Sequence, residues 1–137
     1  MVGTNLAGFF HLTRAAVPHM LARGSGHIVA VTSSLVDNAD SRVPSVLTSL
    51  TKGGLQSAVK SLAIEFAARG VRANAVSPGV IDTPMHPPSR LDALAGLVPA
   101  GRLGAPGDIA GAVMYLETAP YVTGVVLPVD GGQSAGH

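Results

Sequence analysis

Apolar and polar positions alternate along the chain in two distinct patterns. In residues 5–22 the apolar side chains recur at helical spacing, which predicts an amphipathic helix. Thr4 is expected to cap its start and Gly24 to end it. The helical pattern returns in residues 44–69 and in residues 106–118, so we expect three main helices.

Short apolar runs separate these helices. Residues 27–34, 71–77 and 124–129 are rich in β-branched side chains, as strands covered on both faces are. Residues 35–44 are polar and are expected to form a loop, and residues 89–97 a short helix. The order helix, strand, helix, strand, helix, strand predicts an α/β fold with a parallel sheet.

Composition narrows the class of protein. The chain has 137 residues, of which 47% are hydrophobic and 12% charged, so it can bury a substantial core. We find no repeat or linker and expect residues 1–137 to form a single domain. The net charge of +1 comes from scattered residues, which excludes the basic patch of a nucleic-acid-binding protein.

The same composition bears on location. No apolar run is long enough to cross a bilayer, so we expect no membrane partner. The first residues lack the three-part pattern of a signal peptide. The absence of cysteine rules out disulfides and thiolate metal sites, and fits a reducing, cytoplasmic location.

The segment that we expect to face a ligand follows the second predicted strand. In parallel α/β sheets, ligands bind beyond the carboxyl ends of the strands. Residues 77–85 form such a loop, with a Pro-Gly pair and an Asp-Thr-Pro sequence. Lys52, one turn into the preceding helix, is well placed to face the same crevice.

Several motifs together resemble those of the short-chain dehydrogenase/reductase family. They are Lys52, the stretch SLAIEFAARGVRANAVSPG at residues 61–79, the N-L-A-G of residues 5–8, G-R-L-G at residues 101–104 and YVTGVVLPVDGG at residues 121–132. The resemblance covers only the second half of a family member. It implies the C-terminal half of a Rossmann-type doubly wound parallel sheet, a single partial domain without the Gly-rich first half.

The Gly-rich turn of a complete dinucleotide-binding fold is missing. The nearest match, G-S-G at residues 24–26, precedes a strand instead of following one, so we interpret it as a helix-to-strand turn. We therefore interpret Met1 as an internal methionine, left by a truncated gene, by a start placed too late or by a half-length product.

The resemblance implies an NAD- or NADP-dependent oxidoreductase that acts on a small carbonyl compound or secondary alcohol. In the family, a tyrosine four residues before the lysine exchanges the proton, and here Thr48 takes its place. Lys52 would bind the cofactor ribose, Ser34 the substrate oxygen, and Asn5 would support a relay water. A threonine hydroxyl is shorter than a phenol and much less acidic, so the chain alone is expected to be weak or inactive.

The family likeness also assigns the cofactor loop. Thr83 would contact the nicotinamide carboxamide or the phosphates, Val80 and Ile81 would flank the ring, and Pro78 and Gly79 match the family motif.

Each assignment has a structural alternative. Lys52 can be a solvated helix residue, and Ser34 can satisfy backbone groups at a strand end. Asn5 can be a helix cap, and Thr83 can be a turn residue before a proline.

Other features leave the substrate and the cofactor type open. The five histidines form no metal-binding pair, so we expect no metal, and only His86 lies in the presumed substrate loop, residues 82–99. The residue that distinguishes NAD from NADP would lie in the absent half.

Self-association is a further expectation. The family builds dimers with the helices that correspond to residues 5–22 and 44–69, and the strand at residues 27–34 would present an apolar edge. We therefore expect a homo-oligomer. The alternatives to an enzyme are an inactive oligomerisation or interaction module and a gene fragment without a role.

Overall fold

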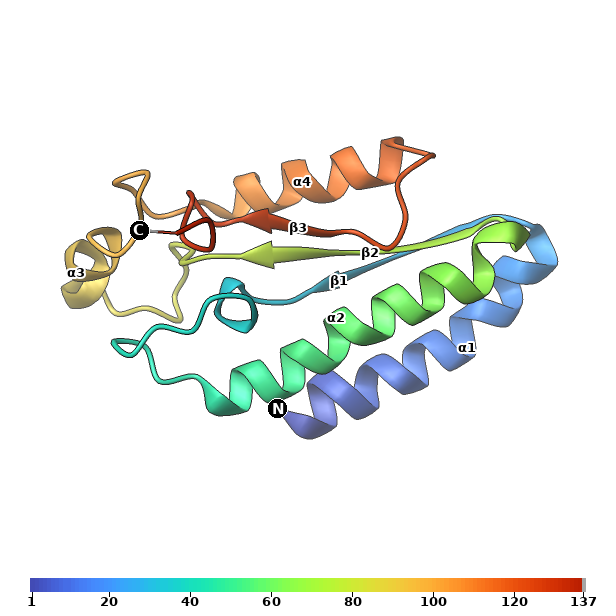
Figure 1. Ribbon diagram of the computed structural model, residues 1–137, viewed down its shortest axis with the longest axis horizontal. Helices are drawn as coiled ribbons and strands as arrows, with labels where there is room; N and C mark the ends of the chain where they lie inside the picture. The colour runs from blue at the N-terminus through green and yellow to red at the C-terminus, as the bar shows by residue number, and fades with distance from the viewer. Residues whose placement is uncertain (137) are drawn as a thin grey trace.

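Three parallel strands form the centre of the molecule. The computed structural model describes residues 1–136, so His137 lies outside the described part. The strands are β1 (Gly26–Val31), β2 (Val71–Pro78) and β3 (Val126–Val129), in the order β1-β2-β3 (Figure 1). Both pairings are parallel. The predicted α/β fold with a parallel sheet is confirmed.

Helices precede and connect the strands. They are the π-helical turn η1 (Val2–Ala7), α1 (Gly8–Arg23), the 3-10 turn η2 (Ser34–Val36), α2 (Val46–Phe66), the 3-10 turns η3 (Ala67–Arg69) and η4 (Pro88–Arg90), α3 (Leu91–Ala95) and α4 (Pro106–Thr118). No helix in residues 1–136 is long and apolar enough to cross a membrane.

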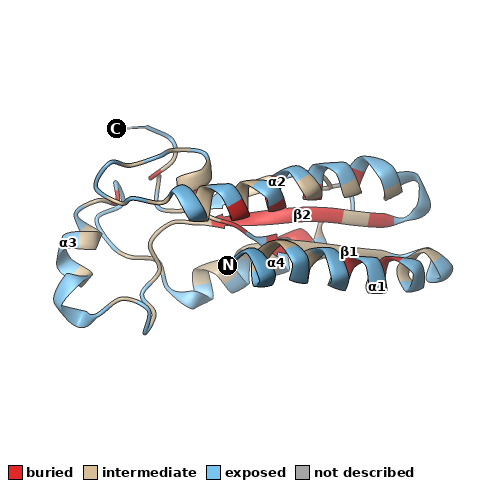
Figure 2. Cartoon of the chain, turned by 90° about the horizontal axis from the view of Figure 1, so that it is seen from below, coloured by how far each residue is buried: buried red, intermediate tan, exposed pale blue. Residues whose placement is uncertain are grey.

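The core lies between the sheet and α2. Leu55, Val59 and Ala63 recur at four-residue spacing on α2 and are at most 5% exposed. They pack against alanines of β1 and β2, whose small side chains let the helix approach the sheet closely. α4 packs on the opposite side of the sheet from α2, and α1 lies alongside α2 (Figure 1). β2, in the middle of the sheet, is the most buried of the strands (Figure 2).

The start of the first helix differs from the prediction. Thr4 does not cap it, because the helical conformation already begins at Val2, in a π-helical turn that continues directly into α1. Gly24 ends α1 as predicted, with φ = 70°.

The strand ends also differ slightly. β1 stops at Val31, so Ser34 lies in the 3-10 turn after the strand and not within it. β3 begins at Val126, two residues later than predicted. Just before it, side chains replace backbone pairing: the N–H of Ala73 donates to the Thr123 hydroxyl (3.1 Å), and the N–H of Val125 donates to the side-chain oxygen of Asn74 (3.0 Å).

Candidate functional site

The carboxyl ends of the strands meet at one edge of the sheet, on the left in Figure 1. η2 follows β1 there, residues 79–87 follow β2, and the turn at residues 130–135 follows β3. α2 begins at the same end of the molecule (Figure 1). The topology therefore gathers the predicted site residues in one region.

Lys52 reaches the end of β1 from the second turn of α2. Its ammonium donates a hydrogen bond to the carbonyl of Val31 (2.7 Å). The neighbouring N–H of Thr32 donates to Val76 of β2, so the Val31 carbonyl points away from β2, toward the free edge of β1. Burial lowers the pKa of Lys52, since a half-buried ammonium loses part of its hydration. A solvated helix residue would have neither feature.

Ser34 lies close to the start of α2. It is only 2% exposed and opens η2, which packs on α2. The Ser49 hydroxyl donates to the Leu35 carbonyl (3.2 Å), and this contact ties η2 to the first turn of α2. Thr48 precedes Ser49 and is half-buried. The structure therefore brings the segments of Ser34, Thr48 and Lys52 together.

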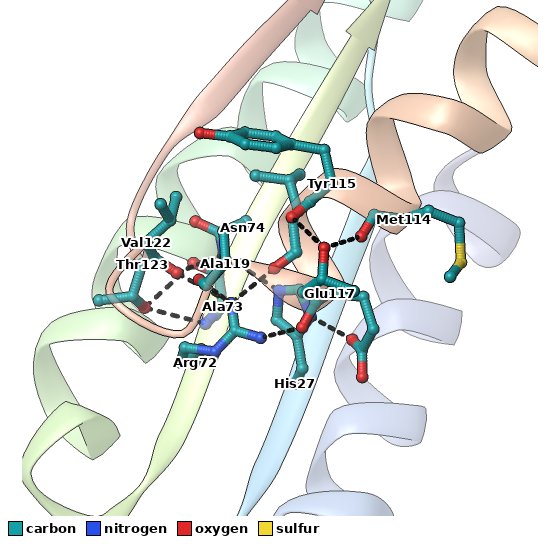
Figure 3. A network of polar contacts seen from close by, with 12 residues as sticks. His27, Arg72, Ala73, Asn74, Met114, Tyr115, Glu117, Ala119, Val122 and Thr123 are labelled. Carbon is teal, nitrogen blue, oxygen red and sulfur yellow. Dashed lines mark hydrogen bonds and ion pairs between the residues drawn. The ribbon is translucent and has the colours of Figure 1, made fainter.

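Neither tyrosine of the chain replaces the missing phenol. Tyr115 is 56% exposed on α4, on the far side of the sheet from α2 (Figure 3). Tyr121 is fully exposed in the turn before β3, close to the amino-terminal ends of β1 and β2. Both lie away from Lys52.

Asn5 is not a helix cap. It lies inside η1, and its side-chain amide donates to the hydroxyl of Thr51 (3.3 Å). Thr51 is fully buried and precedes Lys52. The amide of Asn5 therefore joins η1 to α2 beside the lysine. Single π-helical turns often occur at functional sites.

The loop after β2 is held by two other segments. The N–H of Gly79 donates to the Val129 carbonyl (3.1 Å), and a Cβ on Gly79 would lie 2.8 Å from the Cα of Asp130. On the other side, Gly104 accepts from Asp82 (2.8 Å) and donates to Val80 (3.0 Å). The motif at residues 101–104 thus serves as a backbone clamp for the predicted cofactor loop.

A cavity of about 340 Å³ lies between this loop and the turn after β3. Val80, Ile81 and Asp130 line it, together with Arg102 and Asp108. The guanidinium of Arg102 bonds Asp108 (3.1 Å) and lowers the pKa of that carboxyl. Lys52 and Ser34 do not line the cavity, so it adjoins the loop on the β3 side and is not the space beside the lysine.

Thr83 is half-buried in the same loop, and its carbonyl accepts from the N–H of His86 (3.0 Å). This is the turn that the alternative reading predicts. The contact uses the backbone of Thr83, so the turn does not need the threonine hydroxyl.

A buried polar group near the site was not predicted. The amide of Gln56 donates to Thr32 (3.4 Å) and to Asp37 (3.3 Å), and the Thr32 hydroxyl donates to Val76 (3.1 Å). These bonds fix the polar loop after β1 against α2. The available signal was a glutamine between Leu55 and Val59, on the otherwise apolar face of a helix.

Three parallel strands with helices on both faces, and a cavity beside the loops at their carboxyl ends, define a doubly wound α/β nucleotide-binding type of fold. Residues 1–134 match the family model described as Enoyl-(Acyl carrier protein) reductase. The chain belongs to the short-chain dehydrogenase/reductase family.

Similar proteins agree with this assignment. The chain is 42% identical to "Uncharacterized oxidoreductase YmfI" of Bacillus subtilis, over 96% of its own length and 56% of that protein. It is 40% identical to "Carbonyl reductase family member 4" of Danio rerio, over 94% of this chain and 53% of that protein. The solved structure "ElxO with NADP Bound" superposes with a TM-score of 0.90 at 30% identity, over 99% of this chain and 57% of that one. The chain thus spans about half the length of these relatives.

Proposed function

We propose that this chain is the nicotinamide-facing half of an NAD- or NADP-dependent oxidoreductase acting on a small carbonyl compound or secondary alcohol. The observation that carries the proposal is the position of Lys52, whose ammonium lies at the carboxyl end of β1 beside the segment of Ser34. The carbonyl reductase among its relatives and the NADP held by ElxO support the reaction class and the cofactor.

The residues present suit one end of a dinucleotide. Lys52 would bond the ribose, and residues 78–83 would line the nicotinamide, with Thr83 toward its carboxamide. When bound, the nicotinamide supplies or takes the hydride. Ser34 would hold the substrate oxygen, and Asn5, through Thr51, would fix the helix that carries Lys52. The chain would need a second half for full activity.

Proton transfer is the weak step of this site. With Thr48 in the place of a phenol, the chain lacks the usual proton donor. General acid–base catalysis is typically worth about 10²–10⁴-fold in rate, so we expect slow turnover.

An interaction module is the second candidate. An apolar groove of about 620 Å³ separates α1 from α2, lined among others by Phe9, Phe10 and Leu62. Such a surface suits packing against another copy, and assembly needs no phenol at position 48.

Calorimetric titration of the 137-residue chain with NADH and NADPH tests the first candidate. We expect saturable binding, weaker than for a full-length enzyme because the Gly-rich half is missing. Lys52→Ala should weaken binding at least about tenfold, the value of one charge-assisted hydrogen bond. Lys60→Ala is the matched control, because Lys60 is exposed on the same helix.

Absence of binding by a folded, soluble sample would leave the interaction module as the better account. Equal affinity of wild type and Lys52→Ala would remove Lys52 from the site.

A further inference from the structure

A second polar centre lies at the opposite end of the sheet from the predicted active site. His27, at the start of β1, stands between Glu117 of α4 and Asn74 of β2 (Figure 3). Its side chain is 5% exposed, whereas that of Glu117 is 57% exposed. The imidazole is therefore buried with one nitrogen toward each partner, at 2.6 Å from Glu117 and 3.0 Å from Asn74.

The orientation of Asn74 determines where the imidazole proton lies. The side-chain oxygen of Asn74 accepts from the N–H of Val125 (3.0 Å), and its amide nitrogen donates to the carbonyl of Val122 (2.9 Å). The remaining amide hydrogen faces Nε2 of His27, which must accept it. Nε2 of His27 therefore carries no proton, and the Nδ1–H of His27 donates to Glu117.

Asn74, together with Arg72, also holds the connection between α4 and β3. Arg72, directly opposite His27 in the strand register, donates to the carbonyls of Leu116 (2.8 Å), Ala119 (3.2 Å) and Val122 (3.0 Å). Arg72 and Asn74 thus fix the turn from β2, and His27 is the titratable group that touches this arrangement from β1 (Figure 3).

We propose that His27 makes the attachment of the α4–β3 turn sensitive to pH. Protonation places an N–H on Nε2, where it meets the N–H of Asn74 across 3.0 Å. Asn74 cannot rotate to offer its oxygen without losing both Val122 and Val125. Because two donors cannot share this position, Asn74 gives up its bonds to Val122 and Val125 when His27 takes up a proton, whereas the backbone bond from Gly124 to Ala73 remains.

Other charged and titratable groups surround the imidazole of His27. The Glu117 carboxylate of α4 lies against Nδ1 of His27, and the hydrogen bond from His27 lowers the pKa of Glu117. Arg72 of β2 opposes the positive charge. His27 and Glu117 line a cavity of about 710 Å³. Arg23, at the end of α1, and Tyr121, in the turn itself, line this cavity too.

Amide hydrogen exchange measured by NMR tests the proposal on the chain itself. Between about pH 8 and pH 5.5, a range in which imidazoles titrate, the protection factor of the Val125 amide should fall about three- to tenfold, the value of one hydrogen bond. The Gly124 amide is the internal control. It donates to the backbone carbonyl of Ala73 (2.7 Å), so its protection should change less than twofold.

Two variants separate this account from general acid instability. His27→Gln offers a non-titrating acceptor to Asn74, so the fall at Val125 should disappear. Glu117→Gln removes the group that favours the imidazolium, so the fall should move to lower pH. A constant Val125 protection factor in the wild type, or an equal fall in His27→Gln, would overturn the proposal.

The tautomer gives a measurement that needs no variant. Long-range ¹H–¹⁵N spectra of the wild type near pH 8 should show an unprotonated Nε2 on His27. A proton on Nε2 at that pH would also overturn the proposal.

Discussion

The reactivity of the proposed site depends on one residue, Thr48. An aliphatic hydroxyl holds its proton far more tightly than a phenol does, and each pKa unit corresponds to about 1.4 kcal/mol. Lys52 retains the ammonium that would stabilise a phenolate, and burial lowers its own pKa. On the proposed function, the chain therefore keeps the group that would activate a tyrosine at position 48 and has Thr48 there instead.

Thr48→Tyr tests whether that activating environment is intact. Because Lys52 lies one helical turn further along α2, its positive charge should lower the pKa of the introduced phenol. Titration by ultraviolet absorbance, as the difference from the wild type, removes the signals of Tyr115 and Tyr121. The downward shift should vanish in the Thr48→Tyr/Lys52→Ala double variant, and equal pKa values in the two proteins would show that Lys52 does not act on position 48.

At the scale of the elements, the ends of two helical segments meet at the amino-terminal end of the sheet, where β1 and β2 begin. Gly24 ends α1 and Gly70 ends η3, both with left-handed backbone, φ = 70° and 83°. The carbonyl of Gly70 accepts from the N–H of Gly26, which starts β1 (3.2 Å). A Cβ at position 70 would lie only 2.2 Å from the Gly24 carbonyl oxygen. This contact sets how the two helix–strand units are placed against each other.

Gly70→Ala should therefore destabilise the fold by about 1–3 kcal/mol, the usual cost of a strained backbone conformation, with the steric clash adding to it. Gly111→Ala is the control, because Gly111 lies inside α4 with no atom near its missing Cβ. That change should stabilise the chain by about 0.5–1 kcal/mol. Free energies of unfolding from urea titrations give both values. Equal stability of Gly70→Ala and wild type would contradict the role of this contact.

Elements with local signals could be predicted from the sequence. The bounds of α4 match the prediction at both ends, because Pro106 suits the first turn and the carboxylate of Asp108 accepts the N–H of Ala105 (2.8 Å). The start of the first helix could not be predicted. A π-helical turn has no sequence signature, so Thr4 looked like a cap although it lies inside the helix.

The site was predictable where residues belong to one motif and not where distant side chains meet. The sequence predicts that Lys52 and the loop at residues 77–85 share one crevice. The structure places the Lys52 ammonium on the Val31 carbonyl, at the carboxyl end of β1, while the loop bonds the end of β3 through Gly79. The bond from Asn5 to Thr51 and the meeting of His27 with Glu117 join residues 46 and 90 positions apart, and neither motif nor periodicity encodes such pairs.

At the scale of the whole molecule, two surfaces formed by residues 1–136 have no partner within the chain. One is the apolar groove between α1 and α2. The other is the free edge of β1, where the backbone groups of His27, Val29 and Val31 point away from β2. Lys52 occupies only the Val31 carbonyl. Unpaired edges and exposed apolar patches both favour association with other chains.

We expect the chain to self-associate through the groove, and light scattering of paired variants tests it. Phe10 lines the groove and is 59% exposed; Met114, on α4, is equally exposed outside it. Burying one phenylalanine side chain is worth about 2 kcal/mol, and a two-fold symmetric interface contains each residue twice, so Phe10→Glu should weaken dimerisation by about 4 kcal/mol, roughly a thousandfold in Kd. Met114→Glu should leave the molar mass of the assembly unchanged.

A monodisperse wild-type monomer would show that neither surface drives assembly, whereas oligomers that persist in Phe10→Glu would point to the edge of β1. Val29→Pro distinguishes that case, because it blocks strand addition at an N–H that β2 does not use.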